Sequence, residues 1–176
     1  MSAICRIITG VSGSPRNLPA VRYAAALARD HAATLILLLA WVPPGAGSLD
    51  RRFPSPYLRR EWEQAAWQRL HDAINMALGG VPADVSAELA VVRGEAGPVL
   101  VRAAGAAGDL LVVGTGRCGT AGRLTGGWIS RYCLARAGCP VLAVPPAPLE
   151  LEAAYGLHRR AFRRRRLDLS ELAAGR

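Results

Sequence analysis

A glycine-rich loop between an apolar run and a mixed polar stretch is the part of the sequence best suited to chemistry. Residues 110–113 are apolar, and five glycines follow between residues 115 and 127. This pattern predicts a buried strand, then a loop, then a helix that starts near Gly127. Backbone N–H groups converge at such a junction, and the helix dipole favours negative charge there. The sequence therefore predicts a site for a phosphate or another anion.

The side chains that catalysis or metal binding requires are sparse elsewhere. The three histidines are scattered and no two cysteines form a Cys-x-x-Cys pair, so the ligand spacings of a zinc site are absent. All 22 basic residues are arginines, which excludes a P-loop lysine and lysine Schiff-base chemistry. We expect no catalytic residue and no metal site. A redox role for Cys118 stays open, because its neighbour Arg117 would favour the thiolate.

Length and composition indicate one domain with an extension. The chain has 176 residues, is 51% hydrophobic and has a formal net charge of +9. Its low aromatic content, 6%, implies a core of aliphatic side chains and alanines. No apolar run reaches the length of a membrane span, and the N-terminus lacks a signal-peptide pattern. We expect a cytoplasmic protein with its domain at residues 1–147.

Hydrophobic periodicity predicts five strands that alternate with four helices. The strands are expected at residues 4–11, 34–42, 85–92, 109–114 and 141–144. The helices are expected at residues 17–31, 57–78, 98–107 and 127–137, with Asn17 as a side-chain N-cap of the first and Pro98 in the first turn of the third. Strict alternation of this kind implies an α/β fold, a parallel open sheet with helices on both faces.

Residues 148–176 have a different character and predict a basic helical extension. Leu151, Tyr155, His158 and Phe162 recur at helical spacing, and six arginines lie between Arg159 and Arg166. One interpretation is a solvated helix, or a segment packed on its own domain. The other is a surface for an acidic partner, a nucleic acid or a membrane. The charge pattern leaves both open.

The chain resembles the universal stress protein family over roughly residues 3–146. The pieces that match best are residues 109–114 with the glycine-rich loop, residues 127–134 and residues 139–145. The sequences Val-Ser-Gly-Ser at 11–14 and Val-Arg-Gly at 92–94 match in position. The resemblance implies a five-stranded flavodoxin- or Rossmann-like sheet of the adenine nucleotide alpha hydrolase type. It also implies a homodimer that forms through the last strand, residues 141–144.

Some members of that family bind ATP and others do not. In the binders, an acid at the end of the first strand contacts the nucleoside, and a loop of pattern Gly-x2-Gly-x9-Gly-Ser/Thr holds the phosphates. Here Gly114 and Gly127 match the first and third glycines, and Ser130 matches a further hydroxyl position. Gly94, before the third helix, is a further candidate contact. These residues are the matching part of the predicted nucleotide site.

Three residues depart from the pattern of the binders. Arg117 replaces the second glycine, Trp128 replaces the hydroxyl residue after the third, and Ser12 replaces the acid. A guanidinium still pairs with phosphate, whereas the indole removes a donor and adds bulk. We therefore expect a non-enzymatic, regulatory stress-response protein with a degenerate nucleotide loop and no firm cofactor. The alternative is a switch that binds ATP, or another adenine nucleotide, and hydrolyses ATP slowly.

Overall fold

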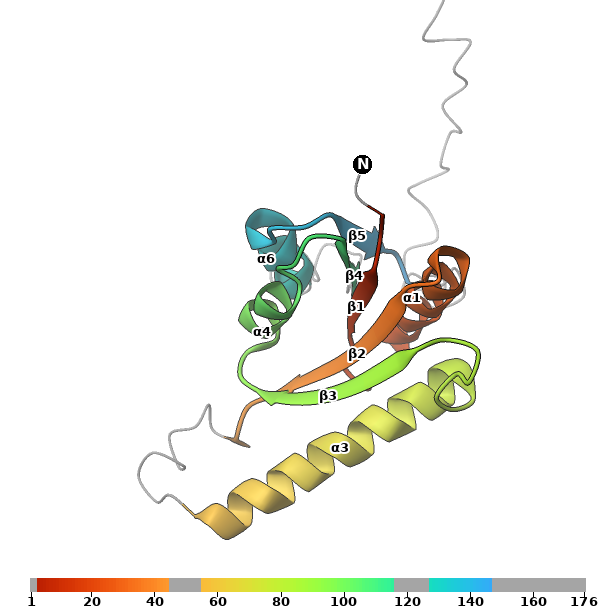
Figure 1. Ribbon diagram of the computed structural model, residues 1–176. Coiled ribbons are helices and arrows are strands. Elements are labelled where there is room, and N and C mark those ends of the chain that lie inside the picture. Colours follow the sequence, from red (N-terminus) through yellow and green to blue (C-terminus); the bar gives the residue numbers. More distant parts are fainter. Residues whose placement is uncertain (1–2, 45–54, 116–126, 147–176) are drawn as a thin grey trace, which may run out of the picture.

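Five parallel strands form the sheet of this protein (Figure 1). The computed structural model describes residues 3–44, 55–115 and 127–146. The strands are β1 (Arg6–Gly10), β2 (Thr34–Trp41), β3 (Ala87–Arg93), β4 (Asp109–Gly114) and β5 (Val141–Val144). Their order is β3-β2-β1-β4-β5, and every neighbouring pair is parallel. The predicted fold class and the five predicted strands are confirmed.

Helices cover both faces of the sheet. They are α1 (Leu18–His31), α3 (Pro56–Leu78), α4 (Ala96–Ala103) and α6 (Trp128–Arg136), with a 3-10 turn η1 (Pro15–Asn17) before α1. Helices α1 and α3 lie on one face, and α4 and α6 on the other (Figure 1). Arg22 of α1 donates from Nε to the Ala77 carbonyl at 2.9 Å and so ties α1 to the end of α3.

The two cores follow from the alternation of side chains along the central strands. Ile7 and Leu35 point into the core under α1 and α3, whereas Ile8 and Leu111 point into the core under α4 and α6. Successive side chains of a strand face opposite sides, so a strand covered on both faces is apolar throughout. Alanines on α1 bring that helix close to the sheet, as the low aromatic content predicted.

Two local predictions are wrong. Asn17 has helical backbone angles and makes no side-chain cap bond; its Oδ1 accepts a 3.0 Å hydrogen bond from the Ser12 N–H instead. Helix α4 spans Ala96–Ala103 and not residues 98–107. Pro98 is its third residue, where the missing N–H costs nothing because that position has no intrahelical acceptor.

An ion pair closes the amino edge of the sheet, where β1 and β4 begin. Arg6 donates from Nε to Asp109 Oδ1 at 2.8 Å and from Nη2 to Asp109 Oδ2 at 2.7 Å. The same guanidinium donates to the Ala103 carbonyl, and Asp109 accepts from the Ala106 N–H. The hydrogen bonds from Arg6 hold the pKa of Asp109 below its ordinary value. The Nε and Nη2 atoms of Arg6 thus have acceptors within the chain.

Several sequence predictions fall outside the described residues. They concern Arg117 and Cys118 in the glycine-rich loop, and the basic extension with its arginines from Arg159 to Arg166. Among the described residues, none of the helices combines the length and the apolar character needed to traverse a bilayer.

Candidate functional site

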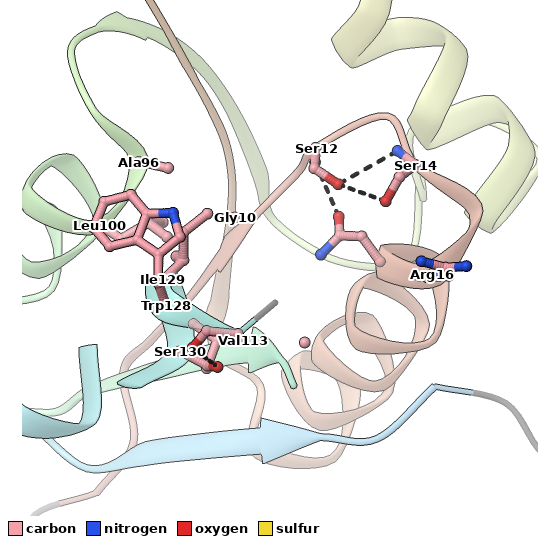
Figure 2. Close-up of a pocket in the computed structure, with 13 residues that line it drawn as sticks. Gly10, Ser12, Ser14, Arg16, Ala96, Leu100, Val113, Trp128, Ile129 and Ser130 are labelled. Atoms are coloured by element: carbon pink, nitrogen blue, oxygen red, sulfur yellow. Dashed lines mark hydrogen bonds between the residues drawn. The ribbon is translucent and has the colours of Figure 1, made fainter. Parts of the chain in front are cut away.

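A cavity of about 330 Å³ lies outside the carboxyl ends of β1 and β4. The chain leaves β1 towards α1 on one face of the sheet and leaves β4 towards α6 on the other. Neighbouring parallel strands with connections to opposite faces leave a crevice between them, and open α/β sheets bind ligands in that crevice. Two walls of different character border this cavity (Figure 2).

The polar wall is the turn from β1 to α1. Its lining residues are Ser12, Ser14, Arg16 and Asn17. The Oγ atoms of Ser12 and Ser14 are 3.0 Å apart, and the Ser14 N–H donates to Ser12 Oγ at 3.3 Å (Figure 2). Together with the bond from Ser12 N–H to Asn17 Oδ1, these contacts fix the turn and leave its remaining donors available.

Two side chains of this turn have donors without an acceptor among the described residues. Arg16 is exposed, and within residues 3–44, 55–115 and 127–146 it has neither a hydrogen bond nor an ion pair. The Asn17 side-chain amide nitrogen, Nδ2, lies 3.7 Å from where a β-carbon on Gly114 would be. That distance places the amide next to the carboxyl end of β4. The turn therefore offers the Asn17 amide to a polar ligand in the cavity, and Figure 2 shows the exposed Arg16 guanidinium on the side of the turn away from Trp128.

The apolar wall belongs to α4, β4 and α6. Its lining residues are Ala96, Leu100, Val113, Trp128 and Ile129. The indole of Trp128 is held edge-on by the Tyr132 ring, with the centroids 6.0 Å apart and an interplanar angle of 76°. A β-carbon on Gly97 would come within 2.9 Å of Tyr132 and 3.4 Å of the indole, so only glycine at that position lets both rings pack on α4. Trp128 therefore forms a wall and leaves the cavity open.

Glycines at strand and helix ends make room for the cavity. A β-carbon on Gly10 would lie 2.9 Å from a Leu100 methyl group. Gly127 precedes α6 with a φ of +82°, a conformation that side chains other than glycine rarely adopt. The Ser130 hydroxyl is buried and donates to the Gly127 carbonyl at 2.9 Å. Its proton is thus used within the first turn of α6.

The structure brings together most of the predicted site residues. Those that line the cavity are Ser12, Gly114, Gly127, Trp128 and Ser130. Gly94 is not among the lining residues: its φ is +149°, and its N–H donates to the Trp41 carbonyl at 2.8 Å, so it shapes the backbone after β3. Arg117 lies outside the described residues. Ligand contact by the five lining residues stays a prediction.

Sequence reasoning missed the cationic side of the site. Ser14, Arg16 and Asn17 were interpreted as a turn and a helix cap, Ala96 as part of a turn, and Leu100 only as part of a helix. A signal for Arg16 was present, because it follows the first strand at the edge where parallel sheets bind ligands. Arg16 is the single charged residue among the described lining residues, which include no acid, histidine or cysteine. This part of the site can bind an anion, but it contains no general base.

Comparison with known proteins agrees with this architecture. The model of the universal stress protein family matches residues 4–145. A universal stress protein of Thermus aquaticus is 34% identical over 139 residues, which are 78% of this chain and 96% of the relative. A universal stress protein solved in complex with cAMP is 28% identical, with a TM-score of 0.53 over 83% of this chain and 100% of its own. UspA from Lactobacillus plantarum, 15% identical over 82% of this chain and 99% of its own with a TM-score of 0.56, shares the fold. The chain belongs to the universal stress protein family.

Proposed function

We propose that this chain is a regulatory protein that binds an adenine nucleotide in the cavity between β1 and β4 and releases it unchanged. The observation that supports the proposal most is the cavity between β1 and β4, bordered by the polar turn after β1 and by the exposed indole of Trp128. Its volume of about 330 Å³ is near the lower limit for small-molecule sites, about 300–1,000 Å³. The relative that was solved with cAMP, at 28% identity, favours an adenine nucleotide.

The chemistry of the lining residues favours binding over catalysis. Among the described residues of the cavity, the polar side chains are hydroxyls, one amide and one guanidinium. None of these removes a proton readily at neutral pH. Magnesium is held in proteins through carboxylates and phosphates, and the described lining residues include no carboxylate. A nucleotide with a single phosphate, which binds without a metal, therefore suits the cavity better than Mg·ATP.

Isothermal titration with cAMP, AMP and ATP, each with and without Mg²⁺, tests the proposal. We expect micromolar affinity for a nucleotide with one phosphate, no gain on adding Mg²⁺, and no phosphate release from ATP above background. Magnesium-dependent ATP binding with phosphate release would instead establish the nucleotide-hydrolysing switch. Absence of binding by all three nucleotides to the folded protein would refute the proposal.

Filling the cavity locates the binding. Ala96 lines the apolar wall and is half-buried, so Ala96→Trp places a large ring in the cavity with little change to the core. Ala135→Trp is the matched control, because Ala135 is exposed on α6 and does not line the cavity. Titration should show nucleotide affinity lost in the first variant and kept in the second. Equal affinity in both would place the ligand elsewhere.

We further propose that the protein is a homodimer paired through β5. This strand ends the sheet on one side, and an unpaired edge strand is prone to association unless a partner covers it. Pro140 and Val144 direct their carbonyls to β4, so Ala143 directs its N–H outward. Ala143→Pro should therefore block pairing between protomers and leave the β4–β5 bonds intact. Sedimentation velocity should show a dimer for the unchanged protein and a monomer for this variant.

A further inference from the structure

The chain leaves the sheet beside the cavity and continues into its arginine-rich segment. We infer that the arginines between Arg159 and Arg166 bind the phosphate of the nucleotide in the cavity between β1 and β4. This inference rests on the proposed function, because it assigns one part of that ligand to a further segment of the same chain. It favours the domain itself over an outside partner as the place where residues 147–176 act.

The described walls of the cavity supply little positive charge. Their polar side chains are hydroxyls, one amide and the guanidinium of Arg16, and Figure 2 shows that guanidinium on the side of the turn away from Trp128. The amide of Asn17 and the first N–H groups of α6 carry only partial charges. A phosphate that loses water in the cavity therefore needs a counterion from another part of the chain.

The strand that precedes the basic segment ends beside the cavity. Val144, the last residue of β5, pairs with Gly114, which lines the cavity. The Thr115 N–H donates to the Val144 carbonyl at 2.9 Å, and the Thr115 carbonyl lies 3.0 Å from where a β-carbon on Gly127 would be. Thr115 thus connects the end of β5 to the residue before α6. Pro146 is buried, so the chain still lies against the domain where the basic segment begins.

The length of chain after β5 allows the arginines to reach the cavity. Arg159 follows Pro146 by thirteen residues, which span at most about 45 Å when extended. A flexible linker of this length has an end-to-end distance of about 20 Å. A group tethered in this way has an effective concentration on the order of millimolar. A contact with a dissociation constant of about 1 mM would then be formed about half of the time.

The domain surface offers the arginines weaker partners than a phosphate. Residues 147–176 carry seven arginines and four acids, so the segment is basic. The exposed carboxylates of Glu61 and Glu63 belong to α3, which packs on β2 and β3, at the other end of the sheet from β5. Glu95 precedes the lining residue Ala96 but is exposed and does not line the cavity. Exposed ion pairs contribute little, whereas guanidinium groups bind phosphate through paired charged hydrogen bonds.

A comparison of adenosine with AMP on the whole chain tests the inference. In the unchanged protein, AMP should bind about 10- to 100-fold more tightly than adenosine, as expected for charged hydrogen bonds to one phosphate. The neutralised variant replaces all six arginines by glutamine: Arg159→Gln, Arg160→Gln, Arg163→Gln, Arg164→Gln, Arg165→Gln and Arg166→Gln. It should lose most of this ratio and keep the affinity for adenosine, which also shows that its cavity is folded. Titration calorimetry measures both ligands.

A control variant separates specific contacts from net charge. Arg60→Glu, Arg69→Glu and Arg102→Glu together change the net charge by as much as the neutralised variant does. All three side chains are exposed and none lines the cavity, so the control should keep the AMP-to-adenosine ratio. Equal loss of the ratio in both variants would attribute it to the overall charge of the protein and contradict the inference.

Other outcomes distinguish the inference from the proposed function. If the neutralised variant keeps the full ratio, the arginines do not bind the phosphate and the inference is wrong, although the proposed function stands. If that variant keeps the ratio but loses a salt-dependent affinity of the unchanged chain for single-stranded RNA, the segment serves an outside partner instead. If the unchanged protein binds no adenine nucleotide, the proposed function itself fails.

Discussion

The two edges of the sheet each present an arginine near β1 but use it differently. At the amino edge, Arg6 donates three hydrogen bonds, two of them to Asp109, which is 3% exposed. At the carboxyl edge, Arg16 lines a cavity and has no partner among the described residues. An arginine therefore contributes to the structure at one edge, whereas at the other edge the donors of an arginine have no acceptor among the described residues.

The difference shows how a structural cation can be told from one that is available to a ligand. Sequence position does not separate the two arginines, because both lie within a few residues of an end of β1. What separates them is whether a buried acceptor of the chain already uses the donors. An arginine whose donors are already bonded within the chain contributes to stability. An arginine whose donors have no acceptor in the chain can contribute to ligand recognition.

The largest expected effect is on stability at the amino edge. Asp109→Asn leaves Arg6 without its charged partner and weakens the link to the Ala106 N–H, so the free energy of unfolding should fall by about 2 kcal/mol. Urea denaturation followed by circular dichroism measures the change. Asp84→Asn is the control: Asp84 pairs with Arg29 in an exposed position and its loss should leave the transition unchanged. Equal effects of the two substitutions would contradict the assignment of the amino edge as structural.

The same pair predicts a dependence of stability on pH. The pKa of Asp109 is lowered in the folded protein, chiefly by the hydrogen bonds from Arg6. Because the pKa is lower in the folded state, ionised Asp109 stabilises the protein fully at a pH above its unfolded-state pKa. This stabilisation is lost as the pH falls through the folded-state pKa. The stability advantage over Asp109→Asn should therefore be full near neutral pH and shrink below the ordinary value of 3.8. Denaturation of both proteins in a pH series measures this; a constant difference in acid would contradict it.

A new carboxylate at the carboxyl edge should alter ligand affinity. Ser12→Asp restores the acid that the resemblance places at the end of the first strand in the nucleotide binders, so adenosine and AMP should both bind about 10-fold more tightly through charged hydrogen bonds to the ribose. Titration calorimetry measures both ligands, and Ser86→Asp, exposed at the amino edge, is the control. Weaker AMP binding with unchanged adenosine binding would mean that the phosphate, and not the ribose, faces this turn.

The smallest expected effect completes the comparison of the two arginines. Arg16→Ala removes no hydrogen bond or ion pair among the described residues, so the free energy of unfolding should change by less than about 0.5 kcal/mol. Arg6→Ala leaves Asp109 buried without its counterion and should destabilise the protein clearly. Parallel urea titrations give the two values. A strongly destabilised Arg16→Ala would show that this arginine, too, has a structural role.

The fold could be predicted from the sequence because its signals are local. The apolar run of β2 and the glycine after α3 indicate a strand and a helix end by themselves, and the strands at Asp109–Gly114 and Val141–Val144 were predicted with these bounds. Helix α4 was predicted two residues late because Pro98 was taken as its first residue. The first helical positions do not need an N–H donor, so proline fits any of them. Its exact position in the first turn is therefore not determined by sequence alone.

The site was only half predictable because its walls come from distant segments. The glycine-rich pattern and the family resemblance pointed to Gly114, Gly127 and Trp128, which line the cavity from the end of β4 and the start of α6. That the indole lies against α4 depends on Gly97, about thirty residues earlier in the chain. Whether Arg16 is free to bind a ligand depends on whether a carboxylate lies near it in the folded protein. No local sequence pattern contains that information.

The central position of β1 has a consequence for how ligand binding can be detected. Strand β1 is hydrogen-bonded on both sides, to β2 and β4, and the side chains of Ile7 and Ile8 are fully buried. Backbone amides of such a strand exchange with deuterium only when the whole domain opens. A nucleotide bound at the end of β1 should therefore slow exchange in all three strands by one common factor, far beyond the residues that it contacts.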